Sequence, residues 1–471
     1  MAAPINQIPA EILALIPDFW DIHKRDRYII ALTHVCRDWR DAFISQPSLW
    51  TNLDCVDADK TRTYIERSKS SPINLSLRRE NDISSNDPFF LVTPPTIRRL
   101  KSLSVEFDVG DLGGIISHLS HRAPLLEDVI LSGNHGFGDG RHEGPLPLSA
   151  LFKGDMSTLR KLCLRFIDTD LPWKNMACLT SFKLFKVSVP TRNLLDFFEG
   201  APRLREVVLD CSTQASGDRD GRLVSMTCLK KMNIVGSTPA RLLLNHLSIP
   251  VGVKLTTQSA GHTFRAVDHL PRSLDNLMNF PGFTTIRLLI GKRWPTVKFS
   301  GPNGKVCMTT KIHTGQCDTT DSLLESLSQF DTSKAERLKL DSCHFKPSGP
   351  PKVLLLVDGL RKIRFNRCQG LRFFIDALDP GLSPSGVVVC PKLEELVLIP
   401  SSDPKGFVHP LVTETSDFRR IIGMVASRAS RGAKLTTVKI VGMHCGRQLD
   451  PAEVSELRKY VWNVEYDDGG Q

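Results

Sequence analysis

Histidines form the first group of residues whose type and spacing could do chemistry, because imidazole binds transition metals. The group comprises His118, His121, His135 and His142. A metal site needs three or four converging ligands, and neither a CxxC pair nor an HExxH pattern accompanies these histidines. Two further pairs, Cys343–His344 and His444–Cys445, are adjacent in the chain, and neighbours on a strand point to opposite faces. We therefore expect no metal site.

Glycine-rich stretches are the second candidate, since backbone amides in such loops can bind phosphates. Gly136–Gly140 and Gly301–Lys305 both lack the Gly-Lys-Ser/Thr ending of a phosphate-binding loop. The first indicates a loop and the second a hairpin turn. No Gly-x-Ser-x-Gly elbow is present, and although a Cys–His arrangement stays open, nothing singles out a nucleophile. We expect no enzyme activity, no catalytic residue and no cofactor.

The composition is that of a globular protein. Of the 471 residues, 41% are hydrophobic and 24% are charged. No apolar run reaches the roughly 18 residues that a membrane-spanning helix needs. The start, Met1–Ile5, has neither the basic region nor the apolar core of a secretory signal. The 12 cysteines lie in apolar contexts without CxxC spacing, which indicates reduced thiols in an intracellular protein, cytoplasmic, nuclear or both.

The net charge of +10 is unevenly distributed along the chain. Residues 1–60 contain six Lys/Arg and nine Asp/Glu, a net charge of −3, so the rest of the chain carries +13. A basic body favours acidic or phosphorylated partners, although a surface that is simply solvated would show the same excess. Nucleic-acid binding is disfavoured, because aromatic residues make up only 7% and no long basic run occurs.

After residue 95 a short apolar template recurs, with Leu or a similar residue at its first, fourth and sixth positions. Its instances begin at Leu100, Leu126, Leu159, Leu179, Leu204, Leu229, Phe283, Ala335, Leu360, Leu393 and Leu435. Most intervals are near the roughly 20–29 residues of a leucine-rich repeat. The intervals of 54 and 52 residues could each hide one degenerate repeat. The template predicts a short strand, and Asn134, Cys343 and Cys368, eight residues after template starts, are predicted to satisfy backbone groups at the next turn.

Segments with helical spacing lie between several templates, at 113–126, 194–202 and 323–330. Strand and helix in alternation predict a parallel sheet with helices outside it. Residues 292–317 instead predict a β-hairpin, inserted at the edge of the repeat array. The loops 133–145 and 292–317 are candidate ligand-binding loops, because binding residues concentrate on loops.

Residues 5–50 predict three short helices. Pro9 suits a first helical position, Glu11 follows in the first turn, and apolar residues then recur at helical spacing. The segments that carry a resemblance are Ile8-Pro9-Ala10-Glu11-Ile12-Leu13, Val35-Cys36-Arg37-Asp38-Trp39-Arg40 and Pro47-Ser48-Leu49-Trp50. In order and spacing they resemble the F-box. The stretch 64–77 resembles the helix and Ser-rich turn that lead, in fungal-type F-box proteins, into the first strand of a leucine-rich-like domain.

The resemblance and the repeats together predict the fold. We expect a small all-α F-box of three short helices, followed by an α/β leucine-rich-repeat-like solenoid with a curved parallel sheet. The predicted boundaries are 1–54 for the helical module, 55–95 for a connecting helix and strand, 96–463 for an irregular solenoid with the hairpin near 292–317, and 464–471 for a flexible tail.

The resemblance implies a substrate receptor of an SCF-type cullin–RING ubiquitin ligase. The F-box would dock on a Skp-type adaptor and through it on a cullin, and the repeat domain would bind an unidentified target protein. The residues implied for adaptor docking are Ile8, Pro9, Ile12, Leu13, Ile16, Leu32, Val35, Trp39, Leu49 and Trp50. Each of them could instead serve only to pack three small helices. The alternative function is that of a protein-interaction scaffold acting outside a ligase.

Overall fold

The computed structural model describes two compact units, 1–219 and 220–471. The described residues are 9, 12, 25–54, 57–78, 93–108, 117–134, 148–167, 176–214, 222–236, 240–261, 269–271, 274–278, 280, 282–290, 295–312, 327, 330–343, 345, 354–355, 357–383, 386–399, 415–441 and 450–467. Each unit is an α/β arrangement with mostly parallel strand pairing, as the alternation of templates and helical segments predicts.

The first unit begins with helices and continues as strands with intervening helices. Its elements are α2 (Arg25–Leu32), α3 (Arg37–Ser45), η3 (Pro47–Trp50), β1 (Asn52–Leu53), α4 (Ala58–Arg67), β2 (Ile73–Arg78), α5 (Pro94–Arg98), β3 (Leu100–Asp108), β4 (Asp128–Asn134), η6 (Leu148–Gly154), β5 (Lys161–Arg165), β6 (Ser181–Pro190), α7 (Thr191–Gly200) and β7 (Glu206–Gln214). The strands pair in chain order from β1 to β7, and every pairing is parallel.

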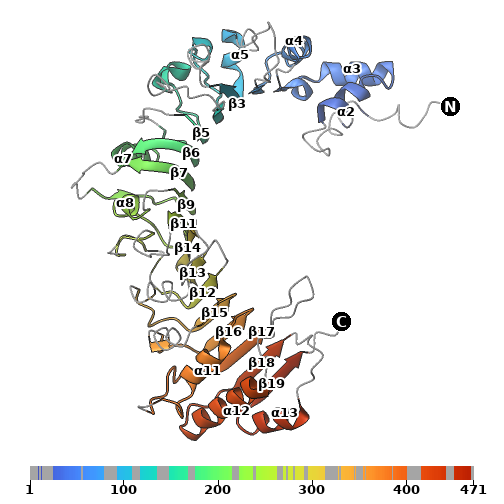
Figure 1. Cartoon of the computed structure of the whole chain (residues 1–471). Helices are drawn as coiled ribbons and strands as arrows, with labels where there is room; N and C mark the ends of the chain where they lie inside the picture. The colour runs from blue at the N-terminus through green and yellow to red at the C-terminus, as the bar shows by residue number, and fades with distance from the viewer. Residues whose placement is uncertain are drawn as a thin grey trace, which may run out of the picture. The chain divides into compact units, whose positions relative to one another are not determined.

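The strands of the first unit present their template residues to a common buried side. Leu103 and Val105 of β3 are opposite Val129 and Leu131 of β4, and all four side chains are at most 2% exposed. The predicted helix at 194–202 is confirmed as α7, which packs on this side of the sheet (Figure 1). Parallel strands need such a covered face, because their connecting helices return across it.

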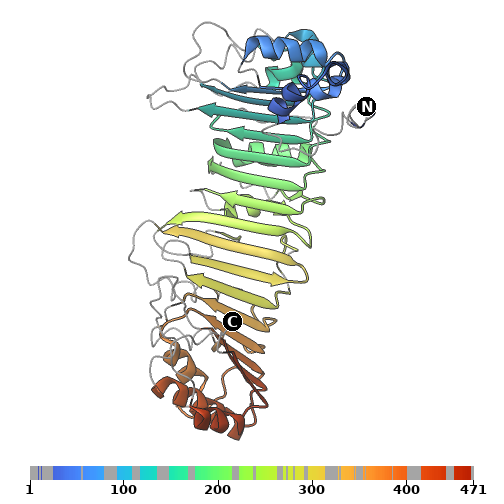
Figure 2. The same cartoon turned by 90° about the vertical axis from the view of Figure 1, so that its right-hand side faces the viewer.

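The second unit contains the remaining elements. They are β8 (Val224–Ser225), β9 (Lys231–Val235), α8 (Arg241–Leu244), β10 (Leu247–Ser248), β11 (Lys254–Gly261), β12 (Thr285–Ile290), β13 (Pro295–Gly301), β14 (Gly304–Ile312), β15 (Arg337–Asp341), β16 (Lys362–Asn366), α11 (Leu371–Leu378), β17 (Glu395–Ile399), α12 (Thr415–Ser430), β18 (Thr437–Val441), α13 (Pro451–Arg458) and β19 (Asn463–Asp467). Figure 2 shows the strands of each unit side by side.

Strand order in the second unit departs from chain order at one place. The ladder runs β9, β11, β14, β13, β12, β15 and then β16 to β19 in sequence. The predicted hairpin is confirmed as β13 and β14, which turn between Gly301 and Gly304. Its predicted place at the edge is wrong, because β14 pairs with β11 and β13 pairs with β12. The inner position pairs the backbone N–H and C=O groups of the hairpin on both sides, which an edge position would leave unpaired on one side.

Helices α11, α12 and α13 lie on one face of β15 to β19 (Figure 1). Phe374 of α11 packs against Phe365 of β16, with ring centroids 4.8 Å apart. Ile421 and Val425 of α12 are fully buried at i, i+4 spacing, which is the apolar stripe of a helix on a sheet. The opposite face of the same strands carries polar side chains, so the sheet has one packed side and one open side.

The template at Leu100 starts at the first residue of a strand, and each of the others starts two residues before the first residue of one. The predicted repeat of strands is therefore confirmed at all its instances. The interval of 54 residues contains β11, and the interval of 52 contains β13 and β14. The Cys368 thiol donates to the carbonyl of Leu340 at 3.2 Å, and Cys343 lies 3.6 Å from the carbonyl of Asp341. These two cysteines therefore act on backbone groups as predicted, whereas the side chain of Asn134 lies outside the described residues.

Both ends of the fold differ from the expected boundaries. Residues 464–467, predicted as part of a flexible tail, belong to β19, which is paired in parallel with β18. Strand pairing begins at residue 52 rather than 96, because β1 and β2 already form the first rungs. The three-helix module stays a prediction, since only Pro9 and Ile12 of its first helix are described.

Candidate functional site

The described N-terminal helices pack on each other through a small set of side chains. Ile29 and Thr33, one turn apart, are buried, and so are Trp39 and Phe43 on α3. The rings of Trp39 and Phe43 lie 6.0 Å apart. Arg40 donates through Nε to the carbonyl of Thr33 at 3.0 Å, which joins α3 to the end of the preceding helix. These contacts place the surface residues of α2 relative to α3.

The Pro-x-Leu-Trp motif forms the link from these helices to the sheet. Pro47 occupies the first turn of η3, where its missing N–H costs nothing. The indole of Trp50 donates to the carbonyl of Phe43 at 2.9 Å, and its ring meets Tyr64 edge-on at 5.0 Å. The guanidinium of Arg67 lies 4.4 Å from the Trp50 ring centroid. Trp50 is 1% exposed, so this motif anchors the helices to α4.

The structure separates the residues predicted for adaptor docking into three groups. Pro9, Ile12 and Val35 are exposed, Ile12 by 52% and Val35 by 55%, and Leu32 is half-buried. Trp39, Leu49 and Trp50 are buried within this chain, which assigns them to packing. Ile8, Leu13 and Ile16 lie outside the described residues. The docking role is therefore testable at the exposed group.

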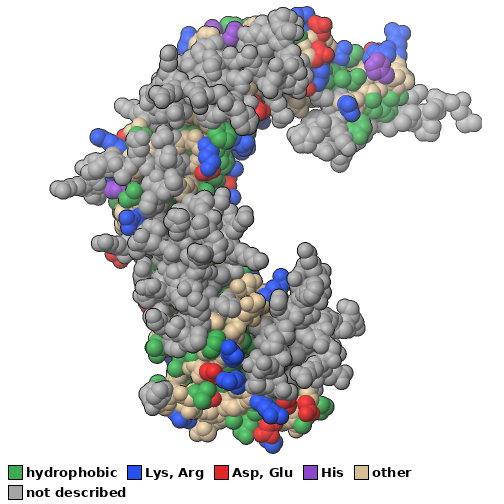
Figure 3. All heavy atoms as spheres, viewed as in Figure 1, with side chains coloured by type: hydrophobic (Ala, Val, Ile, Leu, Met, Phe, Trp, Pro, Cys, Tyr) green, Lys and Arg blue, Asp and Glu red, His purple; other side chains and the backbone are tan. Residues whose placement is uncertain are grey.

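Two exposed apolar residues of α2 escaped the sequence analysis. Tyr28 is 40% exposed and Ile30 is 39% exposed. Tyr28 and Leu32 lie one turn apart on α2, and Val35 follows in the turn after the helix, which continues the i, i+4, i+7 spacing. This set lies on a different side from the buried pair Ile29 and Thr33, so the helical period would have identified Tyr28. Figure 3 shows hydrophobic side chains at the surface over α2 and α3. We call Tyr28, Leu32 and Val35 the α2 stripe.

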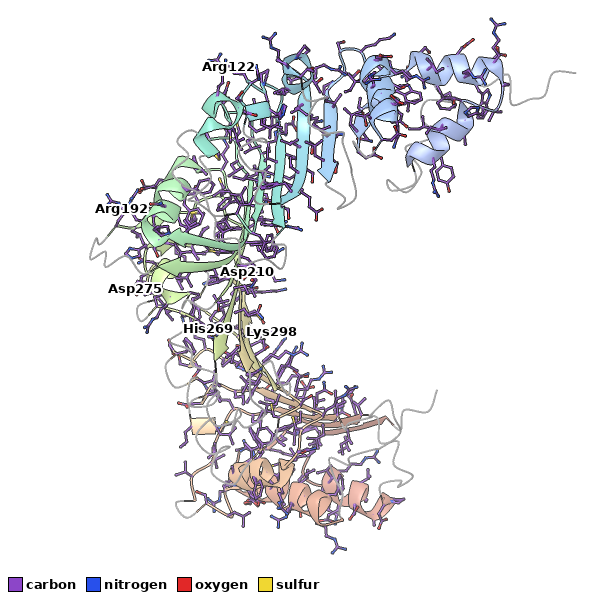
Figure 4. The ribbon with its side chains drawn as sticks, turned by 45° about the horizontal axis from the view of Figure 1, so that its top comes forward. Arg122, Arg192, Asp210, His269, Asp275 and Lys298 are labelled. Atoms are coloured by element: carbon purple, nitrogen blue, oxygen red, sulfur yellow. The ribbon has the colours of Figure 1, made fainter. Side chains whose placement is uncertain are left out.

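The open sheet face of the first unit is balanced in charge. Lys161 pairs with Asp128 at 2.9 Å, and Lys183 pairs with Glu206 at 3.3 Å. Arg165 lies 5.2 Å from the ring centroid of Phe185. Asp210 lies on this open side, whereas Arg192 of α7 lies on the opposite, helix-covered side (Figure 4).

The open sheet face of the second unit is strongly basic. Along β9 and β11 to β19, every second side chain is buried on the covered side, and the side chains between them form the open face. Its described cations are Lys231, Lys254, Arg287, Lys298, Lys305, Arg337, Lys339, Lys362, Arg364 and Lys439, and its described acids are Asp341, Glu395 and Glu465. The excess of positive charge predicted for the body of the chain is therefore concentrated on this face.

On the covered side of the same ladder, a histidine is buried among hydroxyl groups. Nδ1 of His269 lies 3.0 Å from Oγ1 of Thr257, and Nε2 lies 3.0 Å from Oγ1 of Thr310 and 3.2 Å from Oγ of Ser259. His269 is 0% exposed, and burial lowers the pKa of its imidazole to about 3. His269 and Lys298 lie on opposite sides of the sheet (Figure 4). Without access to solvent, this group stabilises the fold.

The candidates for metal and phosphate chemistry have separate outcomes. Within the described part of the chain, no group of three or more His, Cys, Asp or Glu side chains is placed to hold a metal ion. Gly301–Gly304 is the hairpin turn that the sequence predicts, and Gly136–Gly140 lies outside the described residues. The candidate ligand loops 133–145 and 292–317 are described only where they form β4, β13 and β14.

Comparison with models of protein families and with curated proteins finds no match to this chain. A search of the described helices finds none that combines the length and apolar character needed to cross a lipid bilayer.

Proposed function

We propose that this chain is a substrate receptor of an SCF-type cullin–RING ubiquitin ligase, built from an F-box and a leucine-rich-repeat-like solenoid. The N-terminal helices would dock on a Skp-type adaptor, and the ladders would bind a target protein. Such a receptor performs no chemistry itself. It raises the effective concentration of the target lysines near a ubiquitin-charged enzyme and orients them.

One observation carries this proposal. A small helical segment with the F-box motif order keeps Pro9, Ile12 and Val35 exposed, while Trp39 and Trp50 are buried in packing. Exposed apolar side chains on a small helical segment are available to contact another protein. The parallel ladders support the second half of the proposal, because repeated strands offer a long surface for a protein partner.

The test is capture of a purified Skp-type adaptor by the full chain. Val35→Asp places a charge in the α2 stripe without disturbing the buried core, since Val35 is 55% exposed. We expect Val35→Asp, and separately Pro9→Ala with Ile12→Ala, to weaken adaptor binding by about tenfold or more. The matched control is Val251→Asp, at a residue 57% exposed in the second unit, which should bind as the parent chain does.

Adaptor binding that survives both changes unaltered would refute the docking assignment. Capture of the adaptor without assembly onto a cullin would favour the interaction scaffold over the ligase receptor. Trp39→Ala is uninformative here, because loss of a buried indole would destabilise the helices themselves.

A further inference from the structure

Four cations of the open face in the second unit form one row across four adjacent strands. Lys298 of β13 is opposite Arg287 of β12, Arg287 is opposite Lys339 of β15, and Lys339 is opposite Arg364 of β16. We call these residues the central row. Neighbouring strands lie about 4.8 Å apart, so the backbone positions of the row span about 14 Å. This is the length of about four residues of an extended peptide.

Further cations lie beside the row, two residues away along the strands and on the same face. Lys231, Lys254 and Lys305 are opposite one another on β9, β11 and β14. Arg337 and Lys362 precede Lys339 and Arg364 by two residues on the same strands, about 7 Å away on the same face. The positive charge therefore extends along the strands as well as across them.

Most of the central row has no acidic partner among the residues that the structure describes. Arg287 pairs with Asp341 at 2.5 Å, but among the described residues no carboxylate pairs with Lys298, Lys339 or Arg364. On the open face of the first unit, by contrast, Lys161 and Lys183 are each paired. Like charges directly opposite one another oppose folding, so an unneutralised row is a structural cost that a bound anion would remove.

The chemistry of the face selects among anionic partners. Its described side chains on β9 and β11 to β19 include no Phe, Tyr or Trp, so the stacking platform of a single-stranded nucleic-acid site is missing from them. The cations lie on separate strands and do not converge on one point. A ligand with several separate single negative charges therefore matches them better than one phosphate dianion does. Asp341, Glu395 and Glu465 already form ion pairs on this face, so carboxylates fit its geometry.

We propose that the central row and its flanking cations bind an extended, Asp/Glu-rich segment of a partner protein, lying across β13, β12, β15 and β16. Side chains on one side of an extended segment repeat about every 7 Å, so about three carboxylates would lie along the row of about 14 Å and pair with its flexible cationic side chains. The identification of this segment as part of a ubiquitination target rests on the proposed receptor function. The binding itself needs no adaptor and is measured without one.

The experiment uses the full chain and a fluorescein-labelled peptide of alternating Glu and Ser, followed by fluorescence anisotropy at low ionic strength. Three further probes have the same length: the Gln analogue, a peptide with phosphoserine in place of Glu, and oligothymidylate. The test variant carries Lys298→Glu, Lys339→Glu and Arg364→Glu. A second variant carries Gln at the same positions, which removes the charge with less risk to folding.

The matched control carries Lys334→Glu, Lys392→Glu and Arg458→Glu, which are exposed residues of turns and of α13 away from the open face. It changes net charge as much as the test variant does. Circular dichroism and thermal unfolding confirm that all variants are folded.

We expect the Glu peptide to bind and the Gln analogue not to bind. The test variant should lose about tenfold or more in affinity, the Gln variant an intermediate amount, and the control about twofold or less. Equal losses in the test and control variants would reduce the effect to net charge and overturn the proposal. Tighter binding of oligothymidylate or of the phosphoserine peptide, lost in the test variant, would assign the face to that ligand instead.

Failure of this inference is separable from failure of the receptor function. Peptide binding with no adaptor capture would support the binding of acidic segments by the basic face and would refute the ligase role. Adaptor capture with no peptide binding would leave the receptor role and overturn the acidic target.

Discussion

Arg287 and Lys298 are directly opposite each other across the antiparallel pair of β12 and β13, two positive side chains on one face. Asp341 neutralises Arg287 at 2.5 Å, and no described carboxylate neutralises Lys298. Directly opposed like charges destabilise a strand pair, and proteins retain such local conflicts mainly where function needs them. We therefore expect substitutions of these cations on β12 and β13 to change stability and binding in opposite directions.

Replacing Lys298 by Glu should stabilise the folded chain. The new carboxylate would face Arg287 across the strand pair, and the gain should be about 0.5 kcal/mol, the scale of an exposed cross-strand pair. Urea unfolding at neutral pH measures the change. Lys392→Glu makes the same change of charge at an exposed turn residue and should stabilise the chain less than Lys298→Glu does. Lower stability in Lys298→Glu would show that the opposed cations are not a cost.

Protonation of His269 should make the fold sensitive to mild acid. Burial lowers the pKa of His269 from 6.5 to about 3, so the folded state holds the neutral imidazole. The contribution to stability is complete above pH 6.5 and is lost as pH falls below that value, because the unfolded chain then takes up the proton. At pH 5.5 the loss should be about 1.4 kcal/mol.

The measurement for His269 compares urea unfolding at pH 7.5 and pH 5.5 in the parent chain and in His269→Gln. Glutamine can hydrogen-bond to Thr257 and Thr310 but does not titrate, so the variant should lack this part of the pH dependence. An identical pH dependence in both chains would contradict the assignment.

Arg428 should be among the most costly residues to replace. Its guanidinium is 0% exposed, and it donates to the carbonyls of Val389 and Cys390 at 2.7 Å and of Leu378 at 3.4 Å. Burial lowers the pKa of Arg428, and the carbonyls compensate the buried charge. Arg428→Met would leave those carbonyls without a donor and should cost about 3 kcal/mol of stability.

Thermal and urea unfolding check the Arg428 prediction, with Arg419→Met as the control. Arg419 is on the same helix, α12, with 77% of its side chain exposed, and its replacement should change stability by less than about 0.5 kcal/mol. Arg428→Lys should fall between the two, because one ammonium cannot reach carbonyls that a planar guanidinium spans. Equal stability of Arg428→Met and the parent chain would contradict the role of Arg428 as the hydrogen-bond donor to these buried carbonyls.

Cysteine reactivity should separate one exposed thiol from several buried ones. Cys228 is exposed, whereas Cys343, Cys368 and Cys390 are buried. Burial raises the pKa of Cys390 to about 12, and a hydrogen bond to Cys368 together with burial raises the pKa of Cys343 well above its usual value. The thiolate is the reactive form, so iodoacetamide at pH 8 should label Cys228 before Cys343, Cys368 and Cys390.

Mass spectrometry of peptides from the labelled chain gives the order of reaction. The buried cysteines should react only after unfolding in urea, which also provides the control for complete labelling. Labelling of Cys390 as fast as Cys228 in the folded chain would show that the segment before β17 opens readily.

Much of the strand pattern was predictable because it depends on local sequence. A leucine template with period-two burial specifies a strand and its inward side without knowledge of its partner, as Leu338 and Leu340 of β15 illustrate. The roles of Cys343 and Cys368 followed from their fixed distance to the template. The pairing of β14 with β11 did not, because it joins residues about fifty positions apart through contacts that no local pattern encodes.

The candidate docking residues show the same division. The order of Pro9, Val35, Trp39 and Trp50 in the chain was enough to propose a helical module. Burial then separated Val35 from Trp39 and Trp50, since only packing decides which apolar side chains are used within the chain.

By itself, the sequence determined the recurring strands, the helix α7, the hairpin turn and an excess of positive charge in the body of the chain. Only the tertiary structure decided where that charge lies. Arg287, Lys298, Lys339 and Arg364 are scattered over 78 positions from first to last, and strand pairing brings them into one row. Register across a sheet depends on which strands pair, and that is set by burial of the whole face rather than by any one segment.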